Sequence, residues 1–151
     1  MKFDDLREII DFAIEKEQEA IDLYNDLAGK IKNKSIAKEL RELALMEEGH
    51  RDRLKNLNLT AAATKVSKPA HDLKIADYLV EVKPGPEMTW KDVIQIAMKR
   101  ELASMNLYTD LAKLVTDRMA RRLFKNLAAE ESSHKLYFEK IWDGEVLKDN
   151  K

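Results

Sequence analysis

The chain has 151 residues, of which 44% are hydrophobic and 36% are charged, with four glycines, three prolines and no cysteine. The net charge of −1 provides no positive potential that would attract nucleic acid or an anionic membrane. No apolar run is long enough to span a bilayer. The lack of cysteine excludes disulfides and iron centres held by thiolates. We therefore expect one all-α domain over residues 1–151, and a cytoplasmic protein because the N-terminus lacks the apolar core of a signal peptide.

An internal repeat divides this domain into two similar parts. An offset of 84 residues relates residues 5–57 to residues 89–141 without a gap, and residues 58–88 connect the two copies. A repeat of this length is typical of a duplicated supersecondary unit. The matched pairs include Ala13 with Ala97, Glu17 with Glu101, Tyr24 with Tyr108, Glu47 with Glu131 and His50 with His134.

The first copy is predicted to form a helical hairpin. Its first helix is expected over residues 5–29, where Asp5 stands three positions before Glu8 in a start that resembles a capping box. The polar turn "KIKNKS" follows, and we expect Ser35 to cap a second helix that ends near residue 57.

The connection and the second copy complete a four-helix pattern. Residues 58–88 are long for a bundle loop, so we expect a crossover along the bundle, with a short packed element in "DLKIADYLVEV". Two helices are then expected over residues 89–115 and 118–142, the first starting with Thr89 three positions before Asp92. The predicted architecture is a four-helix bundle of two hairpins.

Each predicted helix carries an apolar face that is interrupted near its middle. Residues three and four apart share a face, and on this face the first and third helices carry a glutamate while the second and fourth carry a Glu-x-x-His pair. An ionised carboxylate in a dry core costs several kcal/mol, so buried carboxylates pair, become neutral or bind metal. The six interrupting residues are Glu17, Glu47, His50, Glu101, Glu131 and His134.

The composition of this group favours a dinuclear metal site. No Lys or Arg occupies the same faces, and the carboxylates carry a charge of about −4, which two divalent cations would balance. This donor set is the one found in ferritin-like di-iron and di-manganese proteins. A single Glu-x-x-His pair is common on solvated helices, and a lone core histidine is usually structural. The presence of the Glu-x-x-His pair at equivalent positions of both repeats favours a metal site over a metal-free polar network.

Two pairs of segments carry a family resemblance. They are "AIEKEQEAIDLY" with "LMEEGH" in the first copy, and "AMKRELASMNLY" with "AAEESSH" in the second. With these segments the sequence resembles the rubrerythrin group of the ferritin-like superfamily. The resemblance implies a ferritin-like bundle that holds two iron ions, with manganese or a mixed pair as alternatives.

The resemblance also implies roles for the individual residues. Glu47 and Glu131 would bridge the two metals. The other four residues would be terminal ligands, in the pairs Glu17 with His50 and Glu101 with His134.

Tyr24 and Tyr108 each lie seven residues after an expected ligand, Glu17 or Glu101. They are candidate hydrogen-bond donors to the ligands, or radical quenchers. The alternative is that they pack in the core with the hydroxyl group satisfied locally.

Two departures from the family pattern bear on the function. Typical rubrerythrins carry a rubredoxin domain, for which this chain has no cysteine, and an additional carboxylate at the metal site. One turn on either side of Glu101 there is no acid, since these positions hold Ala97, Met98, Ser104 and Met105. Peroxide reduction by this chain would therefore need an external electron donor, such as a rubredoxin-like protein.

Three functions are compatible with these features. The first is an oxidoreductase that reduces peroxide or dioxygen, the second is a ferroxidase that handles iron for storage, and the third is a non-catalytic bundle stabilised by metal. The expected partners are a small oxidant, the electron donor and further copies of the chain in a homodimer or larger oligomer, with no nucleic acid and no membrane.

Overall fold

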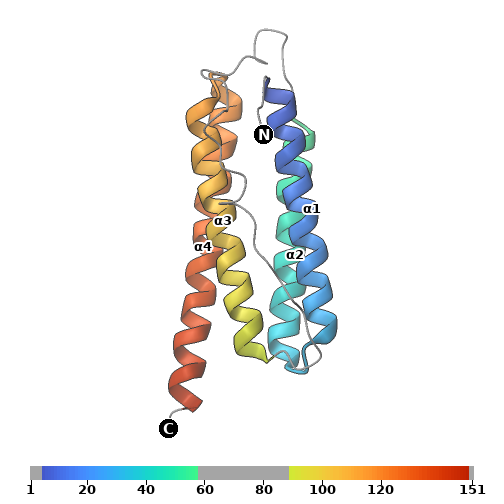
Figure 1. Cartoon of the computed structure of the whole chain (residues 1–151), viewed down its shortest axis with the longest axis vertical. Helices are drawn as coiled ribbons and strands as arrows, with labels where there is room; N and C mark the ends of the chain where they lie inside the picture. The colour runs from blue at the N-terminus through green and yellow to red at the C-terminus, as the bar shows by residue number, and fades with distance from the viewer. Residues whose placement is uncertain (1–4, 58–88, 150–151) are drawn as a thin grey trace.

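The computed structural model describes residues 5–57 and 89–149, and these form two antiparallel helical hairpins that lie side by side (Figure 1). This confirms the predicted all-α class and is consistent with a ferritin-like four-helix bundle. That residues 1–151 make a single domain stays a prediction. The helices are α1 (Leu6–Lys30), α2 (Lys34–Lys55), α3 (Trp90–Leu114) and α4 (Arg118–Asp149).

The helix starts follow from their capping residues. The Asp5 side chain accepts a hydrogen bond from the Glu8 amide at 2.9 Å, and Thr89 and Asp92 form a complete capping box. The prediction that Ser35 caps α2 was wrong. The Asn33 side chain accepts from the Ile36 amide at 3.1 Å, so Ser35 lies in the first turn of the helix. Asparagine caps helices as well as serine does, and here it comes first in the chain.

The fourth helix is longer than predicted, since it continues to Asp149 rather than ending near residue 142. The segment "DGEVLKD" contains no proline, and one glycine costs an interior helical position only about 1 kcal/mol relative to alanine. Gly144 therefore does not end the helix.

The connection between the hairpins lies outside the described residues, and so do the predicted crossover and its short element. Figure 1 shows that α2 ends at one end of the bundle and that α3 begins at the opposite end. None of the described helices has both the length and the apolar character needed to cross a membrane.

Apolar side chains form two separate clusters, and each contains residues from all four helices. One cluster includes Leu6, Leu54 and Phe124, and the other includes Leu40 and Phe138. Between the two clusters, each helix buries at least one of the polar residues that interrupt its apolar face, and α3 also buries Arg100 and Ala103 there. The bundle therefore has a polar layer between two apolar layers.

A buried arginine ties the two hairpins together beside this layer. Arg100 on α3 donates from Nη2 to the backbone oxygen of Lys16 on α1 at 2.9 Å, and the same atom lies 3.6 Å from Glu19 Oε2. Residues 16 and 100 are equivalent positions of the repeat, so this contact lies where the two copies meet.

Replacement of the α2 cap tests the corrected start of that helix. Asn33→Ala removes the acceptor of the Ile36 amide and should destabilise the metal-free protein by about 1 kcal/mol. Ser35→Ala is the matched control and should change stability by less than about 0.5 kcal/mol. Urea denaturation in the presence of a chelator measures both variants. A larger loss of stability for Ser35→Ala than for Asn33→Ala would show that Ser35 is the cap.

Candidate metal centre

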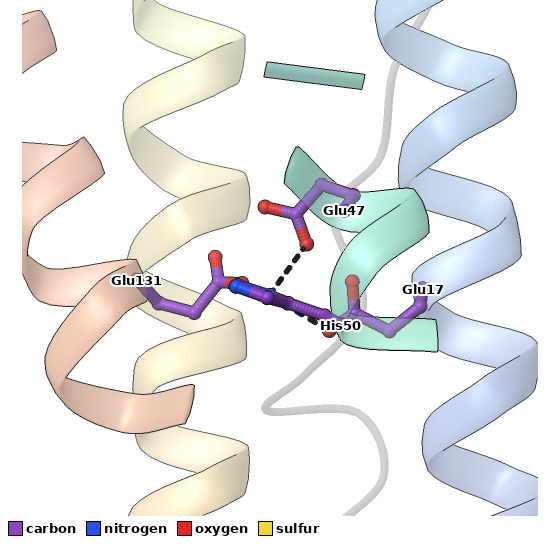
Figure 2. A group of neighbouring side chains, drawn as sticks. All are labelled: Glu17, Glu47, His50 and Glu131. Carbon is purple, nitrogen blue, oxygen red and sulfur yellow. Dashed lines mark ion pairs between the residues drawn. The ribbon is translucent and has the colours of Figure 1, made fainter. Parts of the chain in front are cut away.

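The structure brings the six predicted side chains together in the polar layer. Glu17 comes from α1, Glu47 and His50 from α2, Glu101 from α3, and Glu131 and His134 from α4. All are buried except His134, which is partly exposed. In Figure 2, the side chains of Glu17, Glu47, His50 and Glu131 point toward one another from α1, α2 and α4.

These side chains form two overlapping groups of potential metal ligands. One group is Glu17, Glu47, His50 and Glu131, and the other is Glu47, Glu101, Glu131 and His134. Within each group, one ligand atom from every residue lies within 4.8 Å of the others. The residues common to both groups are the two glutamates that were expected to bridge. The pairs that were expected to be terminal ligands are divided between the groups, with Glu17 and His50 in the first and Glu101 and His134 in the second.

The carboxylate of Glu47 lies between the two histidines. Its Oε2 lies 3.3 Å from Nδ1 of His50, while its Oε1 lies 3.6 Å from Nδ1 of His134. Each oxygen therefore faces a different histidine. On the two sides, Glu131 Oε1 lies 2.8 Å from His50 Nδ1, and Glu101 Oε2 lies 3.5 Å from His134 Nδ1.

Unsatisfied polar atoms indicate that the group fits metal ions. Among the described residues, eight buried side-chain nitrogen or oxygen atoms have no hydrogen-bond partner, and seven of them belong to the six predicted ligands. His50 Nδ1 is one of these seven, although Glu131 Oε1 is close, because the direction of a ring N–H does not suit a hydrogen bond. Buried polar groups almost always have partners. Four carboxylates and two imidazoles, each with at least one buried atom that lacks a partner, match the donors preferred by iron or manganese.

Two buried tyrosines connect the hairpins through these ligands. Tyr24 of α1 donates a hydrogen bond to Glu101 Oε1 of α3 at 2.9 Å, and Tyr108 of α3 donates to Glu17 Oε1 of α1. Each tyrosine therefore donates to a predicted ligand of the opposite hairpin, while the role of these glutamates as ligands stays a prediction. A ligand oxygen held in this way keeps its orientation.

Sequence reasoning missed two residues that support His50. Nε2 of His50 lies 2.9 Å from Glu130 Oε2, and the same oxygen lies 2.8 Å from Nη1 of Arg53. A carboxylate on the far ring nitrogen fixes the orientation of a ligating histidine. The only signal in the sequence is that Glu130 directly precedes Glu131, and the repeat gives no support because the equivalent position is Met46.

In the metal-free protein, protons partly balance the carboxylates. Burial, followed by the charge of neighbouring glutamates, raises the pKa of Glu17 and of Glu131. Burial alone would also raise the pKa of Glu47, but Glu17 and the two histidines lower it. Burial lowers the pKa of the histidines, yet the carboxylates outweigh it and raise the pKa of His50 to about 10 and of His134 to about 9.

Comparison with known families agrees with this geometry. A family model for rubrerythrin matches residues 8–142. The chain belongs to the rubrerythrin family. Neither a curated protein nor a solved structure matches it significantly. Membership of the rubrerythrin family and the buried cluster together indicate a metal site that fits a di-iron centre. Two points about this rubrerythrin stay predictions: the identity of the metal, and its ligation by these six residues.

Removal of one tyrosine hydroxyl should weaken metal binding. Tyr108→Phe leaves Glu17 Oε1 without its donor, so the affinity for cobalt(II) should fall by roughly 10- to 100-fold. Tyr137→Phe makes the same chemical change at an exposed position and should bind as the wild type does. Competition with a chromophoric chelator measures both affinities, and equal values would show that the hydroxyl does not support the ligand.

Metal binding should release protons from the histidines. At pH 7 both imidazoles are protonated because their pKa values are raised to about 10 and about 9, and a protonated Nδ1 cannot bind metal. Loading should therefore release about two protons or more per chain, and the affinity should keep rising from pH 7 to about 9. Calorimetry in buffers of different ionisation enthalpy counts the protons. An affinity that levels off above pH 7 would contradict the raised pKa values.

Proposed function

We propose that this chain is a di-iron oxidoreductase that reduces hydrogen peroxide or dioxygen with electrons from an external donor. The observation that supports it best is that Glu47 and Glu131 belong to both ligand groups, so two metals held there would be neighbours. Two neighbouring irons would supply one electron each to an O–O bond. Reduction of one peroxide to two waters takes two electrons from the donor and two protons from solvent.

The protein side chains keep the site ordered and largely buried. Apolar clusters lie on both sides of the polar layer, and of the six predicted ligands only His134 is partly exposed. Burial, followed by the charge of a neighbouring glutamate, raises the pKa of Tyr24 and of Tyr108. Both hydroxyls therefore keep their protons and stay hydrogen-bond donors to Glu101 and Glu17 throughout the neutral range.

The electron donor that we propose is a rubredoxin-like protein. The chain has no cysteine, so it contains no thiolate-held iron of its own, and the electrons have to come from outside it. We also propose that the protein is cytoplasmic and acts as a homodimer or larger oligomer. The exposed side chains of Leu45 on α2 and Leu136 on α4 support the second of these proposals, since a partner subunit would cover apolar surface.

A stopped-flow experiment tests the proposed reaction. Protein loaded anaerobically with two equivalents of iron(II) is mixed with peroxide or with dioxygen, and oxidation is followed by absorbance. Oxidation of both irons by one peroxide, and their re-reduction by reduced rubredoxin, is the expected result. No reaction with either oxidant would leave a non-catalytic, metal-stabilised bundle. A closed shell of many subunits that accumulates iron would instead identify a storage protein.

Alanine variants of the shared and terminal ligands should differ in metal content. Glu47→Ala and Glu131→Ala each remove a residue common to both groups, so both metals should be lost or bound at least about 100-fold more weakly. His50→Ala and His134→Ala each affect one group, so about one metal should remain. Elemental analysis after anaerobic loading measures the content, and circular dichroism shows that helicity is kept. Two metals in Glu47→Ala at wild-type affinity would disprove the bridging role.

A further inference from the structure

The two sides of the metal centre differ, although the internal repeat makes them equivalent in sequence position. We call the surroundings of His50 the His50 side and those of His134 the His134 side. The offset of 84 residues places Met46 at the position of Glu130 and Tyr137 at the position of Arg53. Two apolar or aromatic side chains on the His134 side thus replace an ion pair on the His50 side.

On the His50 side, α2 and α4 are linked across the outer edge of the histidine. Glu130 of α4 lies 2.9 Å from Nε2 of His50, and Arg53 of α2 lies 2.8 Å from the same carboxylate oxygen. The ion pair contacts the imidazole on the side of Nε2, and the His50 side chain is only 6% exposed. A molecule that approached from this side would have to break the ion pair.

On the His134 side, the same region between α2 and α4 is hollow. A pocket of about 430 Å³ lies against His134, whose side chain is 14% exposed. Met46 and Tyr137 are 53% and 45% exposed at its walls. Its lining also includes Leu43 and Phe138 from the bundle interior, Ser133, and the acids Glu39 and Glu42.

The lining of this pocket selects by charge and size. Glu39 and Glu42 give the pocket acidic charge, which Lys38, 3.9 Å from Glu42, offsets only in part, so the approach is unfavourable for anions. The apolar walls next to His134 give no compensation for a bare charge. The volume is many times the roughly 30 Å³ that one water molecule takes up in the liquid, so a small uncharged molecule fits without rearrangement. Hydrogen peroxide has these properties. The Ser133 hydroxyl donates to the backbone oxygen of Ala129 and the Tyr137 hydroxyl is hydrogen-bonded with Glu39, so both can accept a hydrogen bond from peroxide through their oxygens.

We propose that a small uncharged oxidant reaches the metal centre through the pocket on the His134 side, and that the Glu130–Arg53 pair keeps the His50 side closed. The inference rests on the proposed function, because it concerns how the oxidant of that reaction arrives. It makes the two metal positions unequal: one lies next to the access route, and the other is shielded. Met46 controls the width of the route.

The association rate of an uncharged probe tests this route without turnover. Nitric oxide is mixed anaerobically with the iron(II)-loaded protein, and absorbance gives its rate of binding. Met46→Trp fills the pocket and should slow association at least about tenfold, a change of about 1.4 kcal/mol in the barrier. Met46→Ala should bind at the wild-type rate or faster. Met119→Trp is the matched control, because Met119 is 63% exposed and lies outside the pocket lining.

Iron content is measured for every variant and should stay at two per chain. If Met46→Trp and Met119→Trp bind nitric oxide equally fast, the proposed route is wrong. That result would not contradict the proposed peroxide reduction. Conversely, a protein that does not react with peroxide, but in which Met46→Trp slows nitric oxide association, would overturn only the proposed function. A chain that takes up no iron would overturn both.

A second variant tests the closing role of the ion pair. The double substitution Arg53→Tyr and Glu130→Met copies the residues of the His134 side onto the His50 side. With a second route open, adding Met46→Trp should slow nitric oxide association by less than about twofold instead of tenfold. If Met46→Trp still slows association tenfold in this background, the Glu130–Arg53 pair does not close the His50 side.

Discussion

The structure depends on the burial of four carboxylates and two imidazoles in one layer between two apolar clusters. Such a layer cannot be stable as four bare charges, because each ionised carboxylate that leaves water costs several kcal/mol. Protons provide one form of compensation, and the raised pKa values of His50 and His134 show where they are held in the absence of metal. Metal ions bound by the same residues would provide the other. Protons and metal would then compete for the same lone pairs.

The same layer also joins the two halves of the molecule. Each hairpin is held by its own helix packing, whereas the tyrosine hydrogen bonds run from one hairpin to a glutamate of the other. Both ligand groups include residues from both hairpins, with Glu131 of α4 in the group of His50 and Glu47 of α2 in the group of His134. Binding of metal by both groups would consequently also stabilise the association of the two hairpins.

Much of this arrangement could be predicted from the sequence. The repeat aligns Glu47 with Glu131, and helical periodicity predicts that both lie on the core face of their helices. The four-helix bundle and the convergence of the six residues could therefore be predicted from sequence positions alone. The start of α2 was misplaced by two residues because Asn33 and Ser35 are both good caps, and only the local backbone decides between them.

The asymmetry between the two sides of the centre could not be predicted in this way. Glu130 lies off the core face of its helix, where acidic residues are usually solvated, and its contact with His50 depends on how α2 and α4 face each other. Periodicity describes one helix at a time. Contacts that cross between helices, such as those from Tyr24 to Glu101 and from Arg53 to Glu130, require the packed structure.

The central claim is that the buried layer is one centre holding two coupled metals. It is tested most directly by a Mössbauer spectrum of protein loaded anaerobically with iron-57 and then oxidised, with iron counted per chain. We expect two irons per chain that share their carboxylates, so that the oxidised pair is magnetically coupled and has a diamagnetic ground state. One iron per chain, or two that behave as magnetically independent ions, would contradict the claim.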